Sequence, residues 1–222
     1  MTLLRDRRFR ASTLIRSEAV IGIVRSTAPD RAEAAAQALL AAGLRVIEIS
    51  LTTPGAVAVM ARLAPSVADS GGVIGLGTVL DPARIPEAAE LGASFVVSPV
   101  LDRAVIETAH RHGLAAVPGA QTPGECLACV SAGADFVKLF PATSSSPESL
   151  RQMLAALGQL PIIPTGGVTL AAASAWMASG AVAVAVGSGL ADTDPAVLAD
   201  GLRQLREHRN ERERPDGREQ LR

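Results

Sequence analysis

A strand-helix unit repeats along the chain and is the strongest constraint on its fold. Short runs rich in Val, Ile and Ala alternate with amphipathic stretches that open on Ser, Thr or Asp and end on Gly. Such side-chain oxygens accept hydrogen bonds from the free N–H groups of a first helical turn, and glycine suits the left-handed backbone after the last turn. The expected helix starts are Thr27, Thr53, Asp81, Asp102, Thr122, Ser146, Thr169 and Asp194, and the expected stops are Gly43, Gly92, Gly113, Gly133, Gly158 and Gly180.

Strands that alternate with helices indicate parallel β-α units. Eight such units predict a (β/α)8 TIM barrel, although barrels of this kind usually have ~250 residues. The alternative is a doubly wound open sheet, which often has a glycine-rich turn after its first strand; residues 23–27 contain no glycine. The predicted strands are 20–24, 45–50, 73–76, 94–97, 115–117, 135–138, 161–164 and 182–186.

The predicted domain organisation is simple. Residues 1–18 are expected to form an extra N-terminal helix near the bottom of the barrel, so that residues 1–205 make one domain. Residues 206–222 are dense in Arg and Glu with few apolar residues, which predicts a charged C-terminal tail that becomes disordered.

Composition excludes several classes of partner. The net charge is −1 and aromatic residues make up 2% of the 222 residues, which disfavours a surface for nucleic acid. No apolar run approaches the ~20 residues of a membrane span without glycine, proline or a charge. The arginine-rich start lacks the apolar core of a signal peptide. We therefore expect a cytoplasmic protein that binds neither nucleic acid nor membranes.

Cys126 and Cys129 form a C-x-x-C pair, which can indicate a redox pair or half of a metal site. No second pair of cysteines exists, and His110 and His112 lie on a different segment. The spacing instead places two small residues on one face of a helix. We expect buried thiols, with neither a disulfide nor a structural zinc.

Lys138 is the only lysine of the chain, and it lies in the apolar run 136–141. Burial disfavours the charged ammonium, and a lysine that is neutral near pH 7 can form a Schiff base with a carbonyl. The alternative is a lysine at a strand end that extends to water. Strand periodicity places Phe136, Lys138 and Phe140 on one face, expected to be the barrel interior.

The same periodicity places Glu48 of the second strand inside the barrel, with Val46 and Ser50. A buried carboxylate is costly unless it is paired or functional, so Glu48 is a candidate general acid/base or an ion-pair partner of Arg25 or Lys138. Thr78 shares the parity of Ile74 and Leu76, which we take as pointing to the centre. Arg25 ends the first strand and is able to hold a carboxylate or phosphate.

The last two predicted strands end in glycine-rich segments, 164–168 and 186–189. Glycines allow backbone N–H groups to approach an anion closely, and many (β/α)8 enzymes bind phosphate at these two loops. The alternative is two tight turns. Gly166, Gly167 and Ser188 are therefore candidate phosphate ligands.

Several short motifs occur in an order that resembles the 2-keto-3-deoxy-6-phosphogluconate (KDPG) and 4-hydroxy-2-oxoglutarate (KHG) aldolase family of class I aldolases. The resemblance covers about residues 17–205. The motifs are EISLTTP at 48–54, GLGTV at 75–79, SP at 98–99, VPG at 117–119, FVKLFP at 136–141, PTGGV at 164–168 and GS at 187–188.

The resemblance implies a homotrimeric barrel in which a Schiff base on Lys138 cleaves KDPG, a 2-keto acid phosphate of Entner-Doudoroff carbohydrate metabolism, to pyruvate and glyceraldehyde 3-phosphate. It implies Glu48 as the proton shuttle. No metal and no cofactor is expected, since the iminium itself withdraws electrons. By position, the other substrate-binding residues are Thr78, Pro99 and Thr165 around pyruvate, Phe140 beside the lysine, and Gly166, Gly167 and Ser188 at the phosphate.

One position departs from the commoner family pattern. Some members carry an arginine at the position of Thr52, where it binds the pyruvate carboxylate, and others carry threonine there with an arginine at the end of the first strand. This chain follows the second pattern, and the hypothesis is that Arg25 supplies the missing cation. The related 2-keto-3-deoxy-6-phosphogalactonate aldolases share that arginine.

Other functions stay open. The same imine chemistry serves phosphogalactonate, the C4 epimer, and KHG, which gives pyruvate and glyoxylate. A phosphosugar isomerase or epimerase would use paired acid/base groups or a metal, but His110 and His112 fall at a helix end, away from the strand tips. A non-catalytic binder of phosphorylated metabolites would leave the inward Lys138 and Glu48 unexplained.

Overall fold

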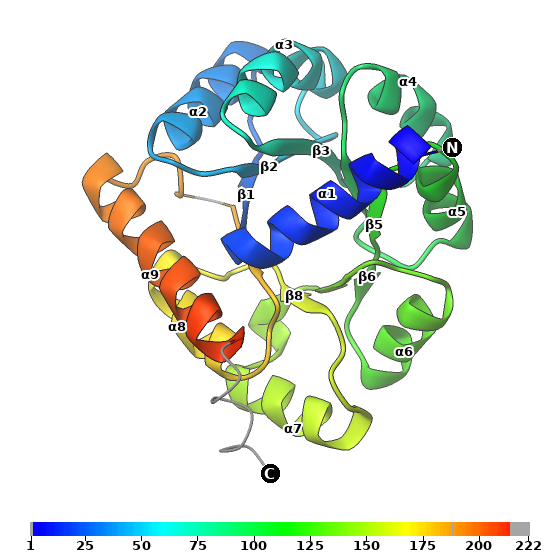
Figure 1. Ribbon diagram of the computed structural model, residues 1–222, viewed down its shortest axis with the longest axis vertical. Coiled ribbons are helices and arrows are strands. Elements are labelled where there is room, and N and C mark those ends of the chain that lie inside the picture. The colour runs from blue at the N-terminus through cyan, green and yellow to red at the C-terminus, as the bar shows by residue number, and fades with distance from the viewer. Residues whose placement is uncertain (1, 188, 214–222) are drawn as a thin grey trace.

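The computed structural model describes residues 2–187 and 189–213 and shows an α/β fold in which helices surround a curled parallel sheet (Figure 1). The strands are β1 Val20–Val24, β2 Val46–Ser50, β3 Val73–Gly77, β4 Phe95–Val97, β5 Ala115–Val117, β6 Gly119–Ala120, β7 Val137–Leu139, β8 Ile162–Pro164 and β9 Val184–Val186. The helices are α1 Thr2–Glu18, α2 Pro29–Ala41, α3 Ala56–Asp69, α4 Ile85–Glu90, α5 Arg103–Arg111, α6 Pro123–Ser131, α7 Pro147–Leu157, α8 Leu170–Ala178 and α9 Pro195–Glu213, with 3-10 turns η1 Pro82–Arg84 and η2 Ala142–Ser144.

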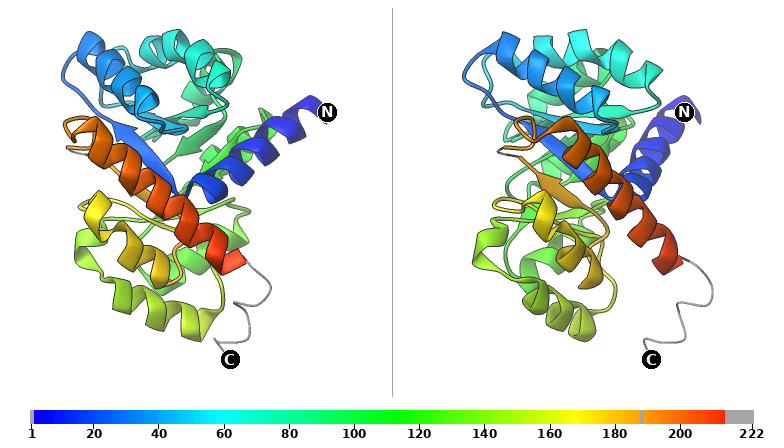
Figure 2. Two further views of the ribbon diagram at one scale, coloured as in Figure 1. Left: turned by 60° about the vertical axis from the view of Figure 1, so that its left-hand side comes forward. Right: turned by 90° about the vertical axis from the view of Figure 1, so that its left-hand side faces the viewer.

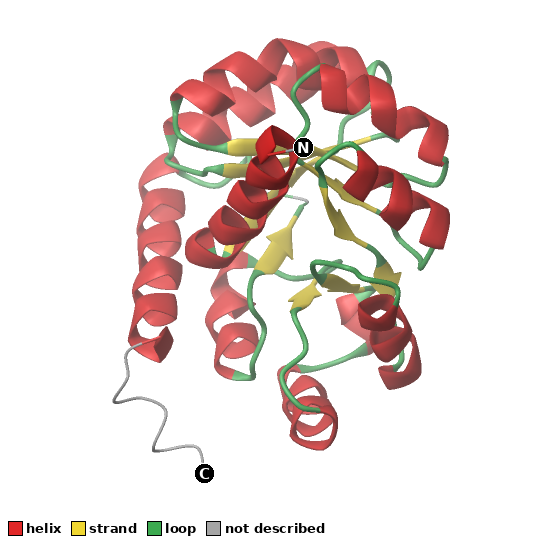
Figure 3. Ribbon diagram, turned by 45° about the vertical axis from the view of Figure 1, so that its right-hand side comes forward, coloured by secondary structure: helices red, strands yellow, loops and turns green. Residues whose placement is uncertain are grey.

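The strands form two parallel sheets. One has the order β5-β4-β3-β2-β1-β9 and the other the order β6-β7-β8. A single bridge between Thr165 and Ala185 joins the end of β8 to β9. The strands curl around one centre with the helices outside them (Figure 3). The α/β class and its parallel units are thus as predicted.

All eight predicted strands are present, with bounds that differ by at most two residues, and only the short β6 was not predicted. The six glycines predicted at helix ends have φ between +72° and +107°. Caps form as predicted at Asp102, Thr122, Ser146 and Thr169.

Two predicted helix starts are wrong. Helix α2 begins after Ala28, and α3 begins after Gly55 with a left-handed φ of +65°. The Thr53 hydroxyl instead accepts a hydrogen bond from the backbone N–H of Ser26 at 3.1 Å. The Thr53 hydroxyl was predicted to cap helix α3, but it binds the backbone of the β1–α2 segment instead.

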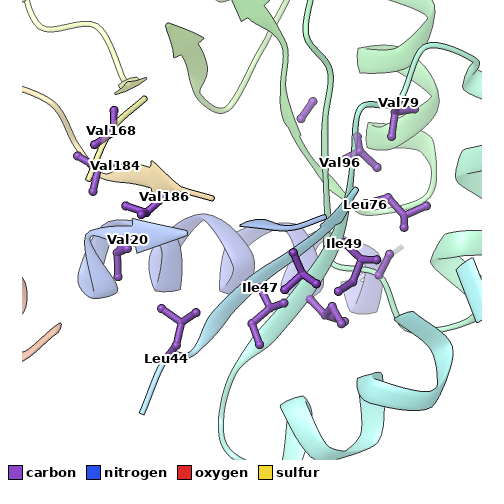
Figure 4. Packing of buried hydrophobic residues seen from close by; sticks show 14 of the residues in the cluster. Val20, Leu44, Ile47, Ile49, Leu76, Val79, Val96, Val168, Val184 and Val186 are labelled. Carbon is purple, nitrogen blue, oxygen red and sulfur yellow. The ribbon is translucent and has the colours of Figure 1, made fainter. Parts of the chain in front are cut away.

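Apolar residues fill two layers, one on each face of the curled sheet. The outer layer lies between strands and helices and includes Ile47, Ile49 and Leu76 (Figure 4). The inner layer, enclosed by the strands, includes Phe95 and Phe136. Since successive strand residues point to opposite faces, a side chain next to an outer-layer residue faces the centre.

Helix α1 covers the amino-terminal end of the strands, where a helix was predicted (Figures 1 and 2). Its Ala11 and Ile15 are completely buried in the inner layer. Arg8 forms an ion pair with Asp135, whose carboxylate also lies 3.1 Å from His110 Nε2 and accepts from the backbone N–H of Ala116. These contacts fix α1 across the bottom of the sheet.

Helix α9 continues past the predicted domain end at residue 205 as far as Glu213, and Arg206 donates to Glu18 and to the carbonyl of Gly43. The predictions for residues 214–222 and for Ser188 fall outside the described residues. Within the described ranges, no helix combines the length and apolar character needed to cross a bilayer. Cys126 and Cys129 are free and buried, and burial raises their thiol pKa values to about 11 and about 12.

Candidate active site

Lys138 lies inside the curled sheet. Its neighbours Val137 and Leu139 belong to the outer layer, so the alternation of β7 turns the lysine inward, as predicted. Lys138 is only 4% exposed, and its Nζ lies 4.8 Å from the centroid of the Phe140 ring. Burial lowers the pKa of Lys138 and the charge of Arg25 lowers it further, while Glu48 opposes both. The site therefore makes the neutral, nucleophilic form of this amine more accessible than in a free lysine.

Glu48 faces the same interior from β2, between outer-layer residues Ile47 and Ile49. It is 1% exposed, and its Oε2 atom has no hydrogen-bond partner among the described residues. Burial raises the pKa of Glu48, although the positive charges of Lys138 and Arg25 lower it in part. A carboxyl group with a raised pKa keeps its proton to a higher pH than a free glutamate, which suits a group that both accepts and donates protons.

Room for this carboxylate comes from a glycine on the neighbouring strand. A Cβ built at Gly77 of β3 would collide with the Glu48 side chain. The inward positions of β3 are Gly75 and Gly77, since Ile74 and Leu76 lie in the outer layer. Any larger residue at position 77 would displace the proposed acid/base group.

A cavity of about 150 Å³ brings six predicted site residues together. They come from the ends of β1, β7 and β8, where parallel-barrel enzymes hold their active sites. Phe140 and Thr165 form part of the wall, and the cavity also reaches Gly187 next to the undescribed Ser188. The six residues are Arg25, Lys138, Phe140, Thr165, Gly166 and Gly167.

Glu48, Thr78 and Pro99 do not line this cavity. Pro99 lies against Gly119, because a Cβ at Gly119 would collide with the Pro99 carbonyl, and Gly119 pairs in register with Lys138. Pro99 is therefore close to the strand pair that carries the lysine without reaching the cavity wall.

The prediction for Thr78 used the wrong strand face. Ile74 and Leu76 point outward, so their parity does not turn Thr78 to the centre. Thr78 instead has a left-handed backbone with φ +60°, which interrupts the strand alternation. Its Oγ1 lies 3.0 Å from Oγ of the inward-facing Ser50, so the side chain does contact the inner face.

Sequence reasoning assigned no role to Ser50 or Thr143. Ser50 is completely buried at the end of β2, and its Oγ also lies 2.9 Å from Thr52 Oγ1. Ser50 lies two residues after Glu48 on the same strand, so the sequence already indicated that both side chains point to the same face. Thr143 lies against Gly167, where a Cβ would collide with its methyl group. No sequence pattern pointed to Thr143.

Arg25 is exposed at the rim of the site. It lines the cavity and also a neighbouring groove that it shares with Thr52. Its charge acts on the pKa values of both Lys138 and Glu48. This location is compatible with the hypothesis that Arg25 supplies a cation near Thr52.

The β8 loop supplies the glycine-rich part of the site. Gly166 and Gly167 have φ of +86° and +80°, in the left-handed region that favours glycine. A Cβ at Gly166 would press on the Phe140 ring at 3.0 Å. Both positions therefore require glycine, and their backbone lies at the cavity wall.

The opposite end of the sheet holds the one described histidine-carboxylate pair, His110 with Asp135. Within the described part of the chain, no group of three or more His, Cys, Asp or Glu residues could hold a metal ion. The described acid/base groups at the carboxyl ends of the strands are Glu48 and Lys138, which suits imine chemistry better than an isomerase with a metal held by histidine.

Comparison with known proteins identifies the family of this chain. A family model described as "KDPG and KHG aldolase" matches residues 12–202. The chain is 36% identical over 186 residues to a probable 2-dehydro-3-deoxy-6-phosphogalactonate aldolase of Rhizobium meliloti, covering 83% of this chain and 86% of the relative. It is 29% identical over 191 residues to the KHG/KDPG aldolase of Escherichia coli, covering 86% and 89%. A solved structure described as native KDPGal superposes with a TM-score of 0.75 at 28% identity, covering 86% of this chain and 94% of that one.

Proposed function

Because the chain belongs to the KDPG and KHG aldolase family and is therefore an aldolase, a carbon-carbon lyase, we propose that it cleaves a 2-keto-3-deoxy-6-phospho sugar acid through a Schiff base on Lys138. One observation carries this proposal: the only lysine of the chain is buried, lies at a cavity, and has a lowered pKa. Phosphate binding alone would not require such an amine.

The proposed cycle begins with neutral Lys138 Nζ, which attacks the C2 carbonyl to give a carbinolamine. Glu48 protonates the departing oxygen, and loss of water gives the iminium. Glu48 then accepts the proton of the C4 hydroxyl, the C3–C4 bond breaks so that C4 leaves as the aldehyde of glyceraldehyde 3-phosphate, and the electron pair of that bond enters the iminium to form an enamine. Protonation at C3 and hydrolysis of the imine release pyruvate and restore the amine.

The distal phosphate is proposed to bind at the Gly166–Gly167 loop, with Ser188 as a further candidate ligand. Support comes from the left-handed glycines at the cavity wall, which leave backbone N–H groups accessible to an anion. Thr165, Thr78, Pro99 and Phe140 are proposed around the pyruvate carbons. Arg25 is proposed to bind the carboxylate in place of an arginine at Thr52.

The substrate was predicted as KDPG, with the phosphogalactonate epimer as the alternative. A specific observation favours the alternative: the relatives at 36% and 31% identity are both named as phosphogalactonate aldolases, one as probable. Arg25, which directly follows strand β1, fits that group as well. The choice between them concerns the C4 hydroxyl that Glu48 is proposed to deprotonate.

The test is a retro-aldol assay with KDPG, its galactonate epimer and KHG side by side, together with borohydride trapping in the presence of pyruvate. We expect a covalent pyruvate adduct on Lys138, detected by mass spectrometry, and higher kcat/KM for the two phosphorylated acids than for KHG. Lys138→Arg, which keeps the charge but cannot form an imine, should have no turnover. Turnover by this variant would overturn the proposal.

We further propose that the two sheets close into an eight-stranded barrel and that the protein is a homotrimer. Closure is supported by the Thr165–Ala185 bridge and by hydrogen bonds from Phe136 to the Ala116 carbonyl of β5 and from Lys138 to the Pro118 carbonyl. Exposed Leu80 and Val100, which follow β3 and β4, support a subunit contact at that end. Light scattering during size-exclusion chromatography would measure the oligomeric state.

A further inference from the structure

We propose that Ser50 is a positioning residue, which orients the Thr78 hydroxyl toward the carboxylate of the 2-keto acid; this inference rests on the proposed function of the Lys138 site. Ser50 is the last residue of β2, two positions after Glu48 on the same inward face, and is completely buried. Its Oγ lies 2.9 Å from Thr52 Oγ1 and 3.0 Å from Thr78 Oγ1. The three hydroxyls form a short chain with Ser50 at its centre.

The hydroxyl protons of Thr52, Ser50 and Thr78 limit how these three groups can bond to one another. A serine hydroxyl donates one hydrogen bond and accepts up to two. The other contact to Ser50 Oγ in the described structure is the N–H of Thr52 at 3.5 Å, which is a donor. A buried hydroxyl normally uses its proton, so Ser50 donates to one threonine and accepts from the other. The threonine that accepts the hydrogen bond from Ser50 keeps its own O–H available to donate to another group.

The backbone of Thr78 shows that its side chain is held toward Ser50. A β-branched residue with φ +60° is strained, and such residues persist where their surroundings fix them. This left-handed turn brings Thr78 Oγ1, at the end of the outward-facing series Ile74 and Leu76, to the inward-facing Ser50. The bond to Ser50 is the one described side-chain hydrogen bond of Thr78, so Ser50 fixes where its hydroxyl points.

An anion beside Thr78 would select one donor-to-acceptor direction for the hydrogen bonds between the three hydroxyls. Thr52 then donates to Ser50, Ser50 donates to Thr78, and Thr78 donates to the carboxylate. Each bond polarises the next, which makes the last O–H a better donor than an isolated threonine. Thr52 lines the same groove as Arg25. The series of hydroxyls therefore begins beside the arginine that is proposed to bind the substrate carboxylate. Ser50 itself does not touch the substrate.

The experiment measures the pyruvate concentration that gives half-maximal borohydride trapping on Lys138, with the adduct identified by mass spectrometry. Ser50→Ala should raise this concentration about tenfold, the size expected for one lost hydrogen bond. The amount of adduct at saturating pyruvate should stay at the wild-type level. Ser50→Thr should restore the wild-type value, because it keeps the hydroxyl at the same position.

Two further variants separate positioning from a general loss of structure. Ser50→Cys leaves no cavity, since sulfur is slightly larger than oxygen, but its thiol is a weak donor, so the variant should behave like Ser50→Ala. The double variant S50A/T78A should bind pyruvate no more weakly than T78A alone, because Ser50 acts through Thr78. The inference would be overturned if S50A and S50C reached half-maximal trapping at the wild-type pyruvate concentration. It would also be overturned if the losses in pyruvate affinity of S50A and T78A added up in the double variant. Failure of the wild-type enzyme to form any adduct would instead refute the proposed function.

Discussion

A buried lysine between a carboxylate and a guanidinium has a pKa that both neighbours change. For Lys138, burial is the largest effect and lowers the pKa, Glu48 raises it, and Arg25 lowers it. The neutral amine therefore forms at a pH below the ordinary value of 10.5. The signs of the two neighbours differ, so single substitutions should move the titration in opposite directions.

The only lysine of the chain makes this measurable without assignment, since selective 13C labelling of lysine gives one Cε resonance. We expect its titration midpoint below 10.5 in the wild-type protein, lower still in Glu48→Gln, and higher in Arg25→Ala. The shift in Glu48→Gln follows from the loss of a negative charge that stabilises the ammonium. A wild-type midpoint at the value of free lysine would contradict the description of the site.

We expect Thr78 to reduce the thermal stability of the protein while it strengthens pyruvate binding. Glycine adopts φ +60° without the cost that a β-branched residue incurs, so Thr78→Gly should melt at the wild-type temperature or above it. It should also bind pyruvate about tenfold more weakly, since the hydroxyl is lost. Thr78→Ala is the matched control: it loses the same hydroxyl but keeps a Cβ in the left-handed region. Calorimetry and pyruvate trapping measure the two effects, and equal melting temperatures for the two variants would refute the strain.

At the scale of elements, helix α1 is held by a partly buried carboxylate as well as by apolar contacts. Asp135 binds Arg8 of α1, His110 of α5 and the backbone of Ala116. Asp135→Ala would leave these donors unpaired, and we expect a loss of about 2–4 kcal/mol in the free energy of unfolding. Asp200→Ala removes an exposed pair within α9 and should change it by less than about 0.5 kcal/mol. Urea denaturation compares the two, and similar losses would argue against a special role for Asp135.

The pH dependence of the same contact has a definite sign. Hydrogen bonds from His110, Ala116 and Arg8 outweigh burial and lower the pKa of Asp135 below 3.8. Its contribution to stability is complete above that value and is lost as the pH falls through the lower, folded-state pKa. The gap in unfolding free energy between wild type and Asp135→Ala should therefore be constant above about pH 5 and narrow below pH 3.8.

Some elements were readable from sequence, and the exceptions have physical causes. The alternation of β2 and β7 placed Glu48 and Lys138 correctly, because each lies between two bulky apolar residues that mark the opposite face. The same reasoning failed for β3, whose inward residues Gly75 and Gly77 have no side chain to mark a face. The left-handed turn at Thr78 depends on its tertiary contact with Ser50, which no local pattern contains.

Across the whole molecule, the two sheets share one inner layer. Phe95 belongs to β4 of the six-stranded sheet, and Phe136 precedes β7 of the three-stranded sheet, yet both lie in the same buried cluster with Ile15 of α1. Helix α8 joins β8 to β9 and so spans the seam between the sheets. The only tryptophan, Trp176, lies on this helix and is buried. Its fluorescence therefore reports on the seam.

If the sheets form one closed unit, a substitution in either sheet must be felt at the seam. We expect Phe95→Leu and Phe136→Leu each to reduce the free energy of unfolding by about 1–2 kcal/mol, because each leaves a cavity in the shared layer. The same shift should appear in Trp176 fluorescence and in far-ultraviolet circular dichroism during urea unfolding. Phe9→Leu is the matched control, since Phe9 is 74% exposed on α1 and should shift neither signal. A Phe95→Leu variant whose fluorescence midpoint stays at the wild-type value while its circular dichroism midpoint falls would mean that the two sheets unfold separately, and the proposed closure would be wrong.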